Sequence, residues 1–164
     1  MAGFHAGWDA LEDTHEFFGL LRRFGLGRVQ ALRLAGPDRA RPVAASALST
    51  VLRSAAGSGL PIMVFVGNRG CIGIHTGPVH RIKAMGPWLN VLDPGFNLHL
   101  REDRIATAWV VRKPTADGIV TSLELFDAAG ETIAFLFGRR KPSEPELDGW
   151  RALAAGLAAP EAAP

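Results

Sequence analysis

The chain has 164 residues, of which 48% are hydrophobic and 21% are charged. This length and composition are typical of one globular domain that buries its own core without disulfides or a structural metal. No apolar run approaches the roughly 18 residues that a membrane-spanning helix needs, and a formal net charge of +2 is small for a surface that binds phosphates. We therefore expect neither membrane insertion nor a nucleic-acid partner.

The chain contains a single cysteine, Cys71, so an internal disulfide is excluded. The N-terminal sequence MAGFHAGWDALED lacks the basic and apolar regions of a secretory signal. Both features predict a protein of the reducing cytoplasm. Because Cys71 begins a predicted strand, we expect a buried structural thiol rather than a nucleophile.

The first predicted element is an amphipathic helix that ends in DTHEFFGLLRR (13–23). Trp8, Leu11, His15 and Phe18 follow one another at intervals of three, four and three residues, so on one helix they line a single face. A titratable imidazole in an apolar stripe has two interpretations. It is either a partly buried, hydrogen-bonded structural histidine or a ligand.

The rest of the chain predicts a run of strands between helices. The segment 28–35 follows two glycines and reads as a short strand, and Pro42 opens a second helix. The further predicted elements are that helix over 43–56, strands over 62–66, 71–77, 79–85, 88–92, 96–102, 105–113, 118–126 and 131–140, and a helix from 144 to 157. This order predicts an α+β fold with one large antiparallel sheet and helices packed at its ends.

The chain has no internal repeat and no composition shift that would divide it. We therefore predict a single domain over 1–164, with its core over about 8–157. The Ala/Pro-rich end, residues 158–164, is expected to fray.

Common enzymatic motifs are missing from the sequence. Neither GNRG nor GRRK is a phosphate-binding loop. HTGPVH (75–80) has two histidines without a cysteine or carboxylate neighbour, which makes it a weak zinc site. His5 falls in an expected disordered leader, and His99 on a strand is expected to face solvent. His15 is therefore the histidine of most interest, and no catalytic residue is assigned.

If His15 is a ligand, its partner needs an apolar body and a metal centre. Haem has both, and its propionates favour Arg or Lys. Tyrosine is absent, and Cys71 is not followed by proline, which leaves histidine as the strong axial ligand type. The clusters Arg112-Lys113 and Arg139-Arg140 could pair with propionates, or could simply be solvated strand ends.

Several long segments closely resemble one known family. They are DTHEFFGLLRR (13–23), MVFVGNRGCIGIHTGPVHRIKAMGPWLNVLDPGFNLHLRE (63–102), AWVVRKPTADGIVTSLELFD (108–127) and FGRRKPSEPELDGWRAL (137–153). They are similar to the C-terminal half of the HemS/ChuS/HmuS haem-utilisation proteins, over about Trp8 to Leu157. The resemblance implies the same α+β fold and a cytoplasmic haem carrier, with haem degradation as an activity of some members.

The resemblance also implies site residues. The family's axial histidine falls on His15, and its propionate-binding residues fall on Arg28, Lys113 and Arg140. Where members have Gln and Tyr, this chain has Phe135 and Phe137. These phenylalanines imply an apolar haem pocket with fewer hydrogen-bond donors, which weakens a case for oxygen activation.

The family's longer members consist of two repeats, and this chain resembles one. Single-repeat relatives of the ChuX type associate as dimers, so the resemblance implies a homodimer. On the last strand, the period of two places Ile133, Phe135 and Phe137 on one side. That side is expected to be either an exposed interface or a surface covered by the chain's own helices.

Three functions remain open from the sequence. The first is a haem-binding protein for trafficking or storage, which passes haem to an acceptor such as a haem oxygenase. The second is a haem-degrading enzyme with an external electron donor, since the chain has no flavin or nicotinamide motif. The third is a dimerisation or regulatory module without haem. In the first two, haem is a ligand or a substrate.

Overall fold

The computed structural model describes residues 2–161. In this part of the chain the α-helices are α1 (Ala2–Asp9), α2 (Glu16–Phe24), α3 (Arg28–Ala35), α4 (Ala47–Ser58) and α5 (Asp148–Ala155), and a 3₁₀ turn spans Glu102–Arg104. The strands are β1 (Ala40–Val43), β2 (Ile62–Gly67), β3 (Ile72–Gly77), β4 (Ile82–Met85), β5 (Trp88–Asp93), β6 (Phe96–Arg101), β7 (Thr107–Thr115), β8 (Gly118–Phe126) and β9 (Thr132–Gly138).

The strands form two antiparallel sheets. The larger sheet has six strands in the order β1-β7-β8-β9-β2-β3, and the smaller has three in the order β4-β5-β6. The expected α+β fold with a large antiparallel sheet is confirmed, and the separate small sheet is an addition to it. Long hairpins such as β7–β8 and β8–β9 form because the strands are rich in β-branched residues and are joined by short turns.

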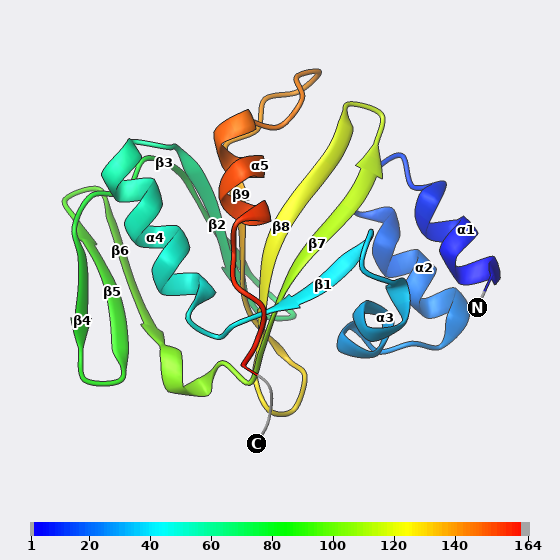
Figure 1. Ribbon diagram of the computed structural model, residues 1–164, viewed down its shortest axis with the longest axis horizontal. Helices are drawn as coiled ribbons and strands as arrows, with labels where there is room; N and C mark the ends of the chain where they lie inside the picture. Colours follow the sequence, from blue (N-terminus) through cyan, green and yellow to red (C-terminus); the bar gives the residue numbers. More distant parts are fainter. Residues whose placement is uncertain (1, 162–164) are drawn as a thin grey trace.

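Two apolar cores lie on opposite faces of the six-stranded sheet. Helices α4 and α5 and the small sheet pack on one face, and α1, α2 and α3 lie together at the β1–β7 end of the other (Figure 1). Side chains alternate between the cores along β7, where Val110 belongs to the first and Trp109 and Val111 to the second. The sheet is therefore buried on both faces at this end.

The expected single helix through His15 is wrong. Helix α1 ends at Asp9 and α2 begins at Glu16, because the Glu16 carboxylate folds back to accept the backbone N–H groups of Glu12 and Asp13, at 2.9 and 3.2 Å. Phe17 rather than Phe18 packs in the core. His15 precedes α2, with a side chain that is 92% exposed, so it does not stand in a buried apolar stripe.

The expected strand over 28–35 is a helix, α3. Its buried residues are Ala31, Leu32 and Ala35, which share one face of a helix at spacings of three and four. A strand would have placed Ala31 and Leu32 on opposite faces of the sheet. The helical period was thus present in the sequence, but the flanking glycines suggested a short strand.

The expected helix over 43–56 begins later. Residues 40–43 form the edge strand β1, where the missing N–H group of Pro42 is tolerated, and α4 starts at Ala47. The expected leader around His5 is also ordered, since His5 lies in α1 and its Nε2 is 2.7 Å from the carbonyl oxygen of Leu34. The last helix starts at Asp148 instead of residue 144.

The expected common side of Ile133, Phe135 and Phe137 is only partly correct. A register shift between β8 and β9 makes Leu125 face Ala134 and Phe126 face Thr132, so Ile133 is an extra residue. Ile133 packs against the core under α4 and α5, whereas Phe135 packs against the core under α1 to α3.

The C-terminal segment after α5 has no regular secondary structure over residues 158–161. It is attached where the carbonyl oxygen of Ala158 accepts the Ala44 N–H group at 2.9 Å. The remaining residues of the expected fraying end, 162–164, lie outside the described residues. Among the helices that are described, none has the length and apolar character needed to span a bilayer.

Candidate functional site

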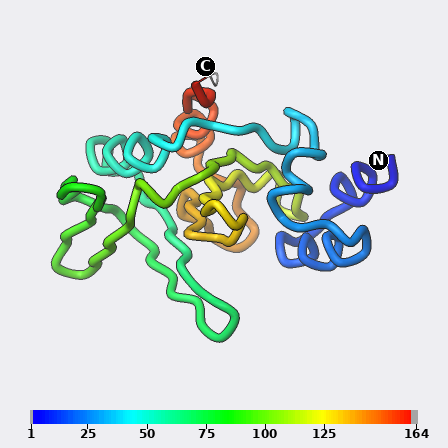
Figure 2. The backbone as a smooth tube through the Cα atoms, turned by 90° about the horizontal axis from the view of Figure 1, so that it is seen from below, coloured from blue at the N-terminus to red at the C-terminus, as the bar shows by residue number. Residues whose placement is uncertain are grey.

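One face of the six-stranded sheet is covered by helices at one end and open at the other. A single row of paired residues crosses five strands on this face: Trp109, Glu124, Phe135, Phe65 and Ile74. Trp109 and Glu124 are 7% and 0% exposed, Phe135 and Phe65 are half-buried, and Ile74 is 56% exposed. We call this the site face. Figure 2 shows the β2–β3 hairpin projecting from the body of the molecule at its open end.

A buried ion cluster lies at the boundary between the covered and open parts. Glu124 accepts two hydrogen bonds from Arg28, through Nε and Nη2, both at 2.8 Å. The Nζ atom of Lys113 lies 2.8 Å from the same carboxylate, and the Ser122 hydroxyl lies 3.0 Å from it. Two positive charges and one negative charge leave the cluster with one net positive charge.

The ion cluster is stabilised as a unit. Burial alone would raise the pKa of Glu124, but the charges of Lys113 and Arg28 outweigh it and hold that pKa well below its ordinary value. The carboxylate is therefore ionised across the physiological range. A buried charge of this kind is tolerated only while its partners are present.

Two aromatic rings enclose the cations. The Arg28 guanidinium lies 5.0 Å from the centre of the Phe17 ring and 4.5 Å from that of Phe135. Lys113 Nζ lies 4.6 Å from the centre of the Phe17 ring. Arg28 keeps 25% of its side chain exposed, whereas Lys113 keeps 5%. Arg28 is thus the cation of the cluster that an external anion can reach.

His15 stands at the N-terminal end of α2, two residues before Phe17. Its Nδ1 atom is 2.6 Å from the Asp13 carboxylate, which also accepts the backbone N–H of His15 at 2.8 Å. Hydrogen bonds from this backbone N–H and from the ring hold the pKa of Asp13 below its ordinary value, and the Arg140 charge acts in the same direction. Among the described residues the other ring nitrogen, Nε2, has no partner.

The four predicted contact residues therefore surround the start of α2. Phe17 contacts both Arg28 and Lys113, and Arg140 exerts its charge on Asp13, next to His15. Arg140 follows the end of β9 and is half-buried. The structure brings together residues from three separate segments of the chain that the sequence alone could only name.

Phe135 and Phe137 lie on the site face, where they continue the apolar surface toward the hairpin. Phe135 pairs with Glu124 and Phe137 with Ser122. The Phe137 ring meets that of Phe65 edge to face, with the ring centres 5.2 Å apart. Ile72 and Ile74 extend this surface on β3 and are 65% and 56% exposed. An apolar, open surface thus adjoins the buried cations.

The other candidate residues of the sequence have different surroundings. His75 stacks on Phe96 with ring centres 3.8 Å apart, and His99 lies 2.7 Å from the Asn90 side-chain oxygen. His80 is exposed. Within residues 2–161, no group of three or more His, Cys, Asp or Glu side chains is placed to hold a metal ion. The expected buried Cys71 is wrong, since this thiol is exposed at the β2–β3 hairpin.

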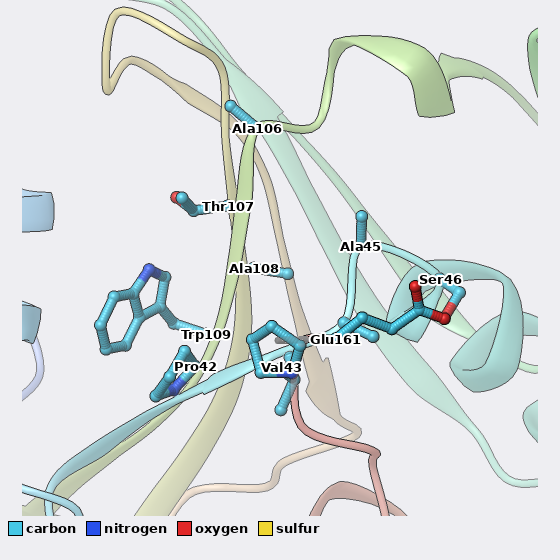
Figure 3. A pocket seen from close by; sticks show the side chains of 11 residues that line it. Pro42, Val43, Ala45, Ser46, Ala106, Thr107, Ala108, Trp109 and Glu161 are labelled. Atoms are coloured by element: carbon cyan, nitrogen blue, oxygen red, sulfur yellow. The ribbon is translucent and has the colours of Figure 1, made fainter. Parts of the chain in front are cut away.

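A separate cavity of about 430 Å³ lies at the edge of the sheet between β1, β7 and the C-terminal segment (Figure 3). Thr107 and Trp109 lie on one side of β7 there, and Ala108 lies on the other (Figure 3). None of the predicted haem contacts lines this cavity. The candidate site is an open face rather than an enclosed pocket.

A family model described as the haemin-degrading HemS.ChuX domain matches residues 25–157. The chain belongs to this family. The matched range contains Arg28, Lys113 and Arg140 but begins after His15. The hemin transport protein HemS of Yersinia enterocolitica is 48% identical over 146 residues, which are 89% of this chain and 42% of that protein.

Solved structures agree in fold. PhuS, a heme-binding protein from Pseudomonas aeruginosa, matches with a TM-score of 0.95 and 56% identity over 96% of this chain and 46% of that one. ChuS, described as a heme-degrading enzyme of Escherichia coli O157:H7, matches with a TM-score of 0.93 and 50% identity over 96% and 47%. The chain thus spans about half the length of these relatives. ChuX matches over 93% of both chains, with a TM-score of 0.74 at 12% identity, which shows the fold alone.

Four site residues were missed in the sequence. Ser122 and Glu124 lie two residues apart on β8, so their side chains share one face of the sheet, and this pattern could have identified a buried charge. Phe17 was overlooked because the expected helix placed Phe18 inward. Asp13 precedes His15 by two residues, but a hydrogen bond between them depends on the loop conformation.

We expect Glu124→Gln to lower the free energy of unfolding by roughly 3 to 5 kcal/mol, because two cations lose a buried counterion. The pKa of Glu124 is depressed in the folded state, so its stabilising effect is complete above about pH 4.5, the ordinary value, and declines as the pH falls below it. The difference in the free energy of unfolding between the variant and the wild type should therefore become smaller at acidic pH. Urea unfolding at neutral and acidic pH measures this difference.

The matched control for this variant is Glu131→Gln, which removes the same charge at an exposed position. It should change the free energy of unfolding by less than about 0.5 kcal/mol. If the two variants unfolded at the same urea concentration at neutral pH, Glu124 would not be the counterion of this cluster.

Proposed function

We propose that this domain binds haem on the site face and carries it, with His15 as the axial ligand. The observation that carries the proposal is an exposed imidazole beside a surface that is apolar on one side and positively charged on the other. Haem needs these three elements, because it has an iron, an apolar macrocycle and two carboxylates. HemS is named a hemin transport protein and PhuS a heme-binding protein, which supports the proposal.

Each contact residue has a proposed part in haem binding. The unpartnered Nε2 of His15 would bind the iron, while Phe135 and Phe137 would pack on the macrocycle. Arg28 would bind a propionate through Nη1, since its other nitrogens hold Glu124. Arg140 would bind a propionate beside Asp13. Lys113 would act mainly through its charge, because its ammonium group is enclosed.

Carriage is favoured over degradation by the composition of the site face. Oxidative degradation of haem needs placed hydrogen-bond donors around bound oxygen, and Phe135 and Phe137 have none. The relative ChuS is described as heme-degrading, so the enzymatic alternative predicts loss of the Soret band with a reductant and oxygen. A carrier would keep the band and release haem to an acceptor protein.

Because Cys71 is an exposed free thiol, we place this function in the reducing cytoplasm.

We expect His15→Ala to weaken hemin binding more than about tenfold and to shift the Soret maximum. The exposed side chain contributes little to the core, so the melting temperature should stay near that of the wild type. Hemin titration followed by absorbance measures the affinity and the Soret maximum. The control is His80→Ala, at another exposed histidine. An unchanged Soret maximum and midpoint would exclude His15 as the ligand. A wild-type protein without any Soret band would favour a regulatory or dimerisation module.

We expect Arg28→Ala and Arg140→Ala to weaken binding of hemin more than binding of hemin dimethyl ester, which lacks the propionate charges. Each loss should be on the order of 1 to 3 kcal/mol for a sheltered contact and less for an exposed one. Arg33→Ala, on the exposed side of the same helix as Arg28, is the control and should affect neither ligand. Equal losses for both ligands would show that the arginines only pack against the macrocycle.

We also propose that two copies of the domain associate through the open part of the site face. This part includes exposed apolar side chains on a projecting hairpin, and the chain spans about half the length of PhuS and of ChuS. A second copy would cover haem from the other side, as a second repeat would.

Sedimentation at micromolar concentration should therefore report a dimer, with or without hemin. Ile74→Lys should produce a monomer, because Ile74 is 56% exposed and the substitution would place a charge within the proposed interface. Ile119→Lys changes a 37% exposed isoleucine of the opposite sheet face and should leave the dimer intact. A wild-type monomer in both conditions would contradict this assembly and would indicate a one-sided haem site.

A further inference from the structure

Asp13 and His15 form a short hydrogen-bonded pair just before helix α2. One oxygen of the Asp13 carboxylate lies 2.6 Å from Nδ1 of His15 and 2.8 Å from its backbone nitrogen. An ionised carboxylate only accepts hydrogen bonds. The proton of the neutral ring must therefore be on Nδ1, and the lone pair on Nε2.

The position of the Asp13 carboxylate is itself fixed. Its chain segment is held by Glu16, whose carboxylate accepts the N–H groups of Glu12 and Asp13 at 2.9 and 3.2 Å. The carbonyl oxygen of Glu12 accepts the N–H of Ala116 at 3.0 Å, which attaches the segment to the β7–β8 turn. A bound backbone N–H on the same oxygen further limits rotation of the Asp13 side chain. The backbone of this segment is thus held by Glu16 and Ala116, and the carboxylate is held by the backbone N–H of His15 as well as by its ring.

We propose that Asp13 is a positioning residue for haem ligation: it keeps His15 in the Nδ1–H tautomer and turns the Nε2 lone pair outward. This inference rests on the proposed function. Metal-binding histidines commonly donate the other ring N–H to a carboxylate, which fixes the tautomer and makes the ligand more basic. The His15 ring is 92% exposed, so packing does little to orient it, and the Asp13 hydrogen bond performs this task.

The tautomer can be measured without haem. In water, a neutral imidazole without a partner favours the proton on Nε2, and the hydrogen bond of one nitrogen decides which nitrogen carries the proton. Long-range ¹H–¹⁵N correlation spectra of the haem-free protein distinguish the two forms, at about pH 8, where an ordinary histidine is neutral. The wild type should show the Nδ1–H form of His15. Asp13→Ala should shift His15 toward the Nε2–H form, and Asp13→Asn, which keeps an acceptor oxygen, should lie between them.

Asp38→Ala is the control for this measurement. Asp38 is an exposed carboxylate of the α3–β1 turn and has no contact with His15 among the described residues. This variant should leave the His15 tautomer as in the wild type. A wild-type protein in the Nε2–H form, or a tautomer that Asp13→Ala leaves unchanged, would overturn the proposal whatever the hemin affinity.

Hemin titration of the same variants tests the consequence for binding. Asp13→Ala should weaken binding by roughly tenfold, and Asp38→Ala should not. In a His15→Ala background, adding Asp13→Ala should have no further effect, because a positioning residue acts only through the residue it positions. An equal loss in both backgrounds would show a direct charge effect on haem and overturn the proposal.

A different result would show that His15 does not bind haem at all. If His15→Ala alone left hemin binding unchanged, His15 would not be the ligand, even with the expected tautomer in the haem-free protein. The spectra therefore test the hydrogen bond and its control of the tautomer, and the titrations test whether haem uses that nitrogen.

Discussion

Glu124 is a carboxylate without contact with water that accepts hydrogen bonds from Arg28 of α3 and Lys113 of β7. An unpaired carboxylate at this depth would be strongly destabilising. Helix α3 must therefore dock where its first residue reaches the centre of the sheet. The rings of Phe17 and Phe135 enclose the same guanidinium, so the start of α2, and with it His15, is placed against this part of the site face.

The partial covering of one sheet face produces the chemical character of the site. Helices α1 to α3 cover the β1–β7–β8 end of this face (Figure 1). The side chains become more exposed along β9, β2 and β3. Charge and apolar surface meet along the boundary. A flat ligand with carboxylates at one edge matches such a boundary better than it matches the half-open cavity beside β1, which has no charged side chain other than Glu161 among its lining residues.

Membership of the HemS/ChuX family places this chain among proteins whose names refer to haem transport, binding and degradation. A shared fold does not fix the function, which depends on the residues of each site. In this chain, Phe135 and Phe137 make the site face apolar beside Arg28, and the Phe137–Phe65 contact extends that surface onto the hairpin. This composition is the basis of our proposal that the domain carries its ligand.

The sequence by itself determined the run of antiparallel strands from residue 62 to residue 138. Alternating β-branched residues and short polar turns are local signals, and local contacts are enough to form hairpins. The family motifs likewise named His15, Arg28, Lys113 and Arg140, without their surroundings. Only the tertiary structure decided that residues 28–35 are a helix, because burial against the sheet selects the period that a short, glycine-flanked segment adopts.

The tertiary structure also decided which charges are neutralised. Arg28 and Glu124 are 96 residues apart in the sequence, so their pairing depends on how α3 packs against β8, and no local pattern encodes it. The exposure of His15 depends on the break between α1 and α2, where a folded-back Glu16 side chain ends one helix and starts the next. Periodicity places residues on a face of one element, whereas burial and charge pairing are properties of elements in contact.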